Sequence, residues 1–172
     1  MWDALSEAVA TLVVVDGALY VAAVLVFLAG KLIYDLVTPF KLDTQLVEED
    51  NPAVGAALGG YYVGLGLVVA GALSGAPKGL MADTISLLVW GGLGIVAMLV
   101  ARWINDRLIL SRIANTAALA DNRRVGVGAA LAGSYVATGF LIQGVIIEGG
   151  PPHVMAALFI AGQIVLIAAA LV

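Results

Sequence analysis

The hydrophobic positions of this chain form five long runs rather than a repeating stripe. The runs cover residues 17–37, 52–73, 84–104, 125–147 and 153–172. Each has the length of about 20 residues that an α-helix needs to cross a hydrocarbon core of about 30 Å. Each is apolar all round, as helices in lipid are, and lacks the period-two alternation of a membrane β-barrel. The pattern predicts an all-α, polytopic membrane helix bundle with five transmembrane helices.

Composition agrees with this prediction and removes several classes of function. Of the 172 residues, 62% are hydrophobic and 12% are charged, against about 45–50% and 25% in ordinary globular domains. The chain has no cysteine and one histidine, so neither disulfides nor the usual zinc clusters are available. A net charge of −4 does not favour nucleic-acid binding. We expect the lipid bilayer to be the main partner, and we expect no metal site and no cofactor.

Polar residues between the runs divide the chain into four segments. Asp16 and Gly17 separate residues 1–16 from the first run. We expect residues 1–16 to form a short helix in the membrane interface, with an outward extension of the first helix as the alternative. Residues 17–74 and 75–147 each hold two transmembrane helices, and residues 148–172 hold the fifth.

The basic residues indicate how the chain is oriented in the membrane. Seven of the eight Lys and Arg residues lie in or beside the loops 38–51 and 105–124, and only Lys78 lies on the other side. The positive-inside rule places those two loops in the cytoplasm. The amino terminus would then lie outside, and five crossings would put the carboxyl terminus in the cytoplasm.

Two stretches of the chain resemble each other. Residues 54–73 read VGAALGGYYVGLGLVVAGAL and residues 127–146 read VGAALAGSYVATGFLIQGVI, with ten of twenty positions identical at an offset of 73. Four upstream polar residues also align at an offset of 71, namely Lys31, Asp35, Asp50 and Asn51 with Arg102, Asp106, Asp121 and Asn122. Because each half holds two crossings, both insert the same way round. The chain is therefore predicted to contain two parallel two-helix repeats.

Small residues recur every four positions in the second and fourth predicted helices. Such rows let helix backbones approach closely, which is how packing holds helices together in lipid. We interpret two rows as the faces through which these helices pack on each other: Ala56, Gly60 and Gly64 in one helix, and Ala129, Gly133 and Ala137 in the other. A substrate path lined by exposed backbone is the alternative.

Two pairs of opposite charges lie near the predicted cytoplasmic ends of the first and third helices. Lys31 with Asp35, and Arg102 with Asp106, have the i, i+4 spacing that places both members on one helix face. In one interpretation the basic side chains extend to the membrane interface. In the other, the repeat brings both pairs towards one axis, where they form a charged vestibule.

Isolated polar residues have structural interpretations. Asn51 precedes Pro52, an arrangement typical of a helix start, and Asn122 has the matching place in the second repeat, so we interpret both as helix caps rather than ligands. Gln143 and Gln163 lie inside their apolar runs. Because an amide needs hydrogen-bond partners in hydrocarbon, we expect both to bond between helices.

Several short motifs follow one another along the chain, namely Thr38-Pro39, Asn51, the run Ala53 to Gly60, Gly91-Gly92, and Asn122 with Gly128-Ala129-Ala130. Through these motifs, over about residues 10 to 147, the chain resembles the bacterial domain-of-unknown-function family 350, the YjfL-like inner-membrane proteins. It implies a location in the bacterial inner membrane and no established activity. Members of this family usually have four spans, so the run 153–172 departs from the pattern.

The sequence contains many features of close helix packing and few residues that could carry out chemistry, and the functional prediction follows from this difference. We expect a non-enzymatic structural or accessory subunit that packs against copies of itself or other membrane proteins, with no catalytic residue. The alternative is an ion or small-solute channel or transporter, to which the parallel repeat and the paired charges Lys31, Asp35, Arg102 and Asp106 point.

Overall fold

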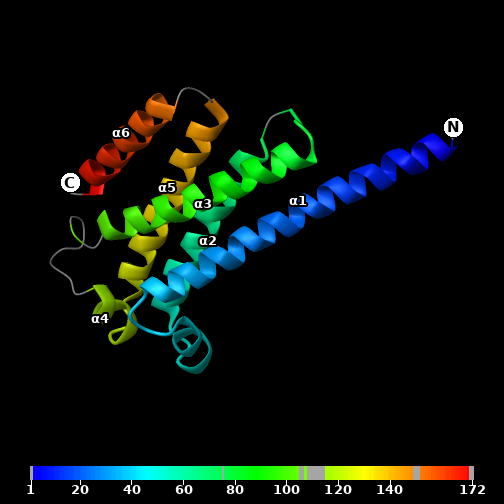
Figure 1. Ribbon diagram of the computed structural model, residues 1–172. Helices are drawn as coiled ribbons and strands as arrows, with labels where there is room; N and C mark the ends of the chain where they lie inside the picture. Colours follow the sequence, from blue (N-terminus) through cyan, green and yellow to red (C-terminus); the bar gives the residue numbers. More distant parts are fainter. Residues whose placement is uncertain (1, 75, 105–106, 108–114, 149–151, 171–172) are drawn as a thin grey trace.

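The computed structural model of the protein describes residues 2–74, 76–104, 107, 115–148 and 152–170. Within these residues the chain forms helices and no strand, so the predicted all-α fold class is confirmed. Figure 1 shows the elements, which are α1 (Trp2–Val37), the π-helical turn η1 (Thr44–Glu48), α2 (Pro52–Ala72), α3 (Leu80–Ile104), α4 (Asn115–Ala120), α5 (Val125–Glu148) and α6 (Pro152–Ala170).

Four helical segments are long and apolar enough to cross a membrane, namely Val13–Val37, Pro52–Ala72, Leu80–Ile104 and Val125–Glu148. They contain 21 to 25 residues, and at about 1.5 Å per residue they match a hydrocarbon core of about 30 Å. The chain thus has the character of a multi-pass membrane protein. In α6 the apolar stretch Ala156–Val165 is shorter than a crossing, so the fifth transmembrane helix stays a prediction.

The first helix is longer than the sequence pattern predicts. The expected break at Asp16 and Gly17 is wrong, because α1 runs without interruption from Trp2 to Val37. A single glycine costs a helix only about 1 kcal/mol relative to alanine, which the helical residues on both sides offset. The described part of the segment 1–16 therefore extends the first helix outward instead of forming a separate interfacial helix.

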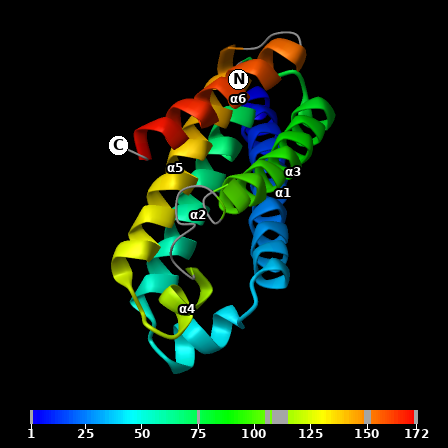
Figure 2. The same ribbon diagram turned by 90° about the vertical axis from the view of Figure 1, so that its left-hand side faces the viewer.

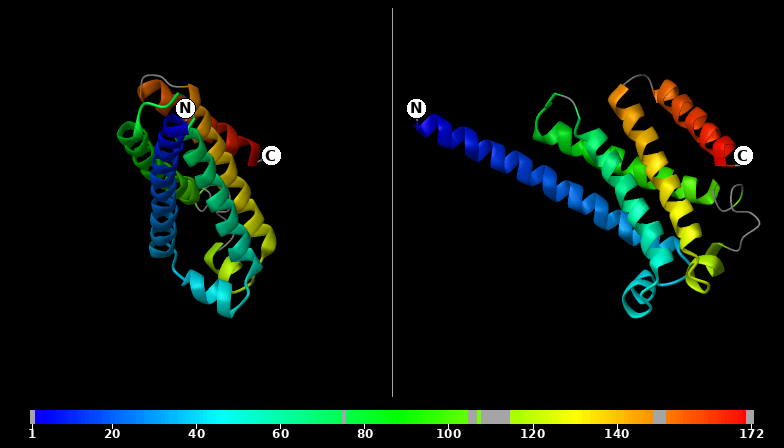
Figure 3. Two further views of the ribbon diagram at one scale, coloured as in Figure 1. Left: turned by 90° about the vertical axis from the view of Figure 1, so that its right-hand side faces the viewer. Right: turned by 180° about the vertical axis from the view of Figure 1, so that it is seen from behind.

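The most extensive contact between helices joins α2 and α5. They lie side by side and run in the same direction, starting from the end of the molecule that holds η1 and α4 (Figures 1 and 3). On the other side α1 packs on α3, where a Cβ on Gly91 would lie 2.7 Å from Cγ1 of Val26. The last helix, α6, lies along α5 (Figure 2). The pair α2–α5 is thus covered by α1 and α3 on one flank and by α6 on another.

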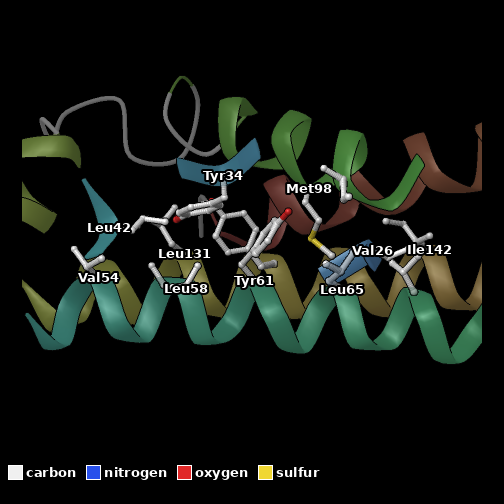
Figure 4. Packing of buried hydrophobic residues seen from close by; sticks show 14 of the residues in the cluster. Val26, Tyr34, Leu42, Val54, Leu58, Tyr61, Leu65, Met98, Leu131 and Ile142 are labelled. Carbon is white, nitrogen blue, oxygen red and sulfur yellow. The ribbon is translucent and has the colours of Figure 1, made fainter. Parts of the chain in front are cut away.

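The buried core lies between the four long helices (Figure 4). Tyr61 and Leu65 of α2 and Met98 of α3 have no exposed surface. Large apolar side chains also cover the outside of the bundle, among them Leu93 and Val165. Such an exterior is unfavourable in water, and it suits helices whose outer surface contacts lipid.

Candidate functional site

The contact between α2 and α5 is made by small residues. Gly60 lies directly against the backbone of Ala132, with no room for a side chain. A Cβ on Gly64 would lie 2.5 Å from the carbonyl oxygen of Tyr135, and a Cβ on Gly139 would lie 2.6 Å from Cα of Gly64. Any larger side chain at these glycines would push the two backbones apart. The close approach of α2 and α5 therefore depends on glycine at these positions.

The small-residue row predicted for α5 is not the row that meets α2. Gly133 is exposed, and nothing lies within 4 Å of a Cβ placed on it. Ala129 is also exposed, while Ala137 and, in α2, Ala56 are half-buried. The prediction assumed that both helices use matching faces, and this assumption is wrong. The side of α5 that approaches α2 is instead formed by Gly128, Ala132 and Gly139.

Asn51 caps α2 and also ties it to two other segments. Its Oδ1 accepts hydrogen bonds from the backbone amides of Ala53 at 3.0 Å and Val54 at 3.3 Å. Its Nδ2 donates to three oxygens, which are Oε1 of Gln45 at 2.6 Å and the carbonyl oxygens of Leu119 at 2.8 Å and Ala120 at 3.2 Å. Asn51 is buried, so these bonds replace those that water would make. One side chain thus joins η1, α2 and α4.

Asn122 does not cap α5, contrary to the prediction. Its Nδ2 donates to the carbonyl oxygen of Ala117 in α4 at 3.2 Å. The residue directly before α5 is Arg124, whose carbonyl oxygen accepts from the amide of Val127 at 3.0 Å. Asn122 therefore closes the preceding turn, and its exposed side chain makes no tie like that of Asn51.

The turns before α2 and α5 explain why the second asparagine is displaced. Asp50 and Arg123 both have a left-handed backbone, with φ of 46° and 50°. Each stands two residues before the first residue of its helix. Asp50 and Arg123 are 73 positions apart, which is the offset that relates the sequences of α2 and α5. The offset of 71, under which Asn51 aligns with Asn122, therefore applies only further upstream. Under an offset of 73, Asn51 aligns with Arg124.

The charges near the end of α1 bind the next segment rather than each other. Nζ of Lys31 lies 3.2 Å from Oδ1 of Asp43, and Oδ1 of Asp35 accepts from the backbone amide of Leu42 at 3.1 Å. The chain turns back after α1, which brings residues 42–43 beside both side chains. The expected pairing of Lys31 with Asp35 is therefore wrong. Both residues instead fasten the segment before η1, in which Leu42 is fully buried.

A further ion pair joins the two turns that precede α2 and α5. Nη2 of Arg123 lies 3.2 Å from Oε2 of Glu49. Both side chains are partly exposed, so the pair contributes about 0–1 kcal/mol. Its position means that the starting points of the two helices are linked to each other.

Arg102 attaches the end of α3 to the end of α1. Its guanidinium carbon lies 5.1 Å from the ring centre of Tyr34, the geometry of a cation–π interaction. Its Nη1 donates to Oγ1 of Thr38 at 2.8 Å, and that hydroxyl donates to the carbonyl oxygen of Tyr34 at 2.6 Å. Asp106, the predicted partner of Arg102, lies outside the described residues.

Three buried tyrosines continue inward from this arginine. The ring centres of Tyr34 and Tyr61 are 4.8 Å apart, and that of Tyr135 lies 5.6 Å from Tyr61 and 6.1 Å from Tyr34. Such ring pairs contribute about 0.5–1.5 kcal/mol each beyond their burial. The hydroxyl of Tyr61 donates to the carbonyl oxygen of Gly30 at 3.2 Å, and Figure 4 shows Tyr34 and Tyr61 side by side. The arginine–tyrosine cluster, defined as Tyr34, Thr38, Tyr61, Arg102 and Tyr135, thus joins α1, α2, α3 and α5.

The two intrahelical glutamines lie at helix contacts. Nε2 of the buried Gln163 donates to Oγ1 of Thr138 at 3.2 Å and so links α6 to α5. Gln143 lies in the α2–α5 contact, where a Cβ on Gly71 would be 3.2 Å from its Cα. Gln163 therefore makes the kind of interhelical bond that the sequence predicts.

The sequence of the chain matches one known protein family. The sequence profile of the family described as Domain of Unknown Function (DUF350) matches residues 6–146. The chain belongs to this family. Comparisons with curated proteins and with solved structures give no match. The DUF350 region runs from α1 to the last turns of α5 and contains the arginine–tyrosine cluster and the Asn51 bonds, while α6 follows it.

Some residues that make these contacts were not singled out by the sequence. Tyr34 and Gln45 follow no periodic pattern, and only the path of the loop after α1 brings them to their partners. Gly139 did leave a signal, because it aligns with Gly66 among the ten identical positions. That signal could not be used, since the sequence does not indicate which side of α5 meets α2.

Proposed function

We propose that this DUF350 protein is a non-enzymatic membrane subunit that acts by packing its helices against copies of itself or against other membrane proteins. The observation that carries the proposal is the contact of Gly64 with Gly139, where two helix backbones touch. A helix pair in such contact leaves no polar path between its members. What it offers is a rigid scaffold with small-residue surfaces, which is how membrane helices recognise one another.

The charged side chains support the same proposal. Lys31 pairs with Asp43, Asp35 accepts from Leu42, and Arg102 donates to Thr38. Each of these contacts fixes one segment of the chain to another. The proposal includes a location in the bacterial inner membrane, with the amino terminus outside, the carboxyl terminus in the cytoplasm, α6 as a fifth crossing and two parallel two-helix repeats.

A channel or transporter is the second candidate. The observation that favours it is that Lys31, Asp35 and Arg102 lie at one end of the bundle, on α1 and α3. Rings of charged side chains at the mouth of a pore set the local potential for entering ions. This candidate is weaker, because each of the three side chains bonds to another segment of the chain.

The experiment that separates the two candidates uses purified protein in lipid. The mass of the complex in nanodiscs and the ion flux into liposomes are measured for the wild type and for Asp35→Asn, which keeps an oxygen for the amide of Leu42. We expect a mass of several copies, or a defined complex with another membrane protein, and a flux equal to that of empty liposomes. A single chain without partners, or a flux that Asp35→Asn alters, contradicts the subunit function.

A further inference from the structure

When the sequences of α2 and α5 are aligned, the residues of a buried face of α2 correspond to the residues of an exposed face of α5. Four small residues of α2 are buried against α5, and we call them the inner face of α2: Ala53, Gly60, Gly64 and Gly71. At the offset of 73 they align with four small residues of α5, which we call the outer face of α5: Gly126, Gly133, Ala137 and Gly144. In the outer face the three glycines are exposed and have nothing within 4 Å of a Cβ.

The reverse relationship holds for the other two faces. The inner face of α5, which receives α2, consists of Gly128, Ala132, Tyr135, Gly139 and Gln143. These residues align with the outer face of α2, which consists of Gly55, Gly59, Tyr62, Gly66 and Ala70. Every member of the outer face of α2 is exposed or half-buried. The chain thus buries one pair of complementary faces and exposes a second pair of closely similar composition.

We propose that the outer face of α5 in one copy packs on the outer face of α2 in a second copy, and so repeats between copies the contact that α2 and α5 make within the chain. This inference rests on the proposed subunit function and specifies its partner and its surface. The internal contact of Gly60 with Ala132 then predicts that Gly133 of one copy meets Gly59 of the next. Likewise, the contact of Gly64 with Gly139 predicts that Ala137 meets Gly66.

The surroundings of the two outer faces are compatible with a docked helix. On α2, Cζ of Phe27 would lie 3.7 Å from a Cβ on Gly66, so α1 borders this face at one edge. Beside it runs an open groove lined by Val24, Phe27, Leu28, Lys31 and Tyr62. On α5, α6 contacts Thr138 and Leu141, which lie on a neighbouring side of the helix, and Gly133 stays open.

The geometry of this contact decides the type of assembly. The two faces differ, so each copy uses its α5 towards one neighbour and its α2 towards the other. Such a contact is heterologous, and it produces a closed ring or an open row rather than a two-fold dimer. We expect a second copy of the chain to cover these faces, because each copy carries both of the complementary exposed faces, one on α2 and one on α5.

Cysteine cross-linking tests the proposal. The chain has no cysteine of its own, so only the introduced cysteines can form disulfides between copies. Gly59→Cys and Gly133→Cys are made singly, with different tags, and are expressed together. Gly92→Cys is the matched control, because this glycine of α3 is also exposed and has nothing within 4 Å of a Cβ. Membranes are treated with an oxidant, and dimers that carry both tags are counted.

We expect the pair Gly59→Cys with Gly133→Cys to give at least several-fold more mixed dimer than Gly92→Cys with Gly133→Cys. A single chain that carries both Gly59→Cys and Gly133→Cys should give a ladder of multimers. Dimers between two copies of Gly133→Cys that exceed the mixed dimers would overturn the proposal in favour of a two-fold contact. A yield equal to that of the control would also overturn it.

The mass of the complex in nanodiscs distinguishes failure of this inference from failure of the proposed function. If several copies assemble while residues 59 and 133 do not cross-link, the subunit function stands and this interface is wrong. If the protein is a single chain without partners, both are wrong.

Discussion

The side-chain amide of Asn51 donates a hydrogen bond of 2.8 Å to the carbonyl oxygen of Leu119, across 68 positions of the chain. The same side chain accepts from the first amides of α2. The start of α2 and the short helix α4 are therefore held by one residue. The described elements η1 and α4 at this end of the bundle are therefore part of the packed structure.

Replacing Asn51 with alanine should destabilise the protein by about 1–3 kcal/mol. The variant loses a helix cap, for which about 1 kcal/mol is typical, and leaves buried carbonyl oxygens without a donor. Thermal unfolding in detergent measures the effect. Asn122→Ala is the matched control and should change stability by no more than about 0.5 kcal/mol, because its side chain is exposed. Equal effects of the two variants would contradict the assignment.

Leucine at Gly139 should prevent the native packing of α2 on α5. A Cβ there would already lie 2.6 Å from Cα of Gly64, and the remaining leucine atoms cannot be placed without separating the helices. We expect aggregated protein or a much lower melting temperature after solubilisation. Gly92→Leu, on the open side of α3, should keep the yield and melting temperature of the wild type. A Gly139→Leu variant that behaves like Gly92→Leu would argue against a close backbone contact.

Valine at Thr38 should loosen the arginine–tyrosine cluster. The substitution keeps the shape of the side chain but removes the hydroxyl that Arg102 contacts at 2.8 Å and that donates to the carbonyl oxygen of Tyr34. We expect a loss of about 1–3 kcal/mol, the usual effect of leaving buried polar groups unsatisfied, read from thermal unfolding. Thr84→Val, in the first turns of α3 and outside the cluster, serves as the control, and its stability should be close to that of the wild type.

The predicted orientation can be tested by accessibility of single cysteines. Lys41→Cys and Ala76→Cys lie at opposite ends of the bundle, and both positions are exposed. If the loop 38–51 is cytoplasmic, a membrane-impermeant thiol reagent should label Ala76→Cys in intact cells and label Lys41→Cys only after lysis. The opposite pattern would reverse the orientation.

The sequence predicted the helices well because each long apolar run must form internal hydrogen bonds in lipid. The starts of α2 at Pro52 and α5 at Val125 agree with the prediction. The extent of α1 did not, since Asp16 and Gly17 interrupt the apolar run without interrupting the helix. Polar residues thus locate the edge of the membrane better than the end of a helix.

The orientation of each helix about its axis could not be predicted in the same way. Helices that are apolar all round have no polar side to point outward, so Gly128 and Gly133 were equivalent candidates for the contact with α2. The partner of Lys31 was equally hidden, because Asp43 is twelve positions away and reaches it only through the turn after α1. Both features depend on tertiary packing.

The common direction of α2 and α5 has an electrostatic consequence. Each helix carries about half a positive elementary charge at its amino end, and two such ends side by side repel each other. Acidic Glu49 and Asp121 stand in the turns beside these ends, where negative charge is favourable. α1 and α3 finish at the same end of the bundle with their negative poles, close to which lie the cations Lys31 and Arg102. The opposed dipoles of α1 and α3 therefore reduce the repulsion between the two parallel neighbours.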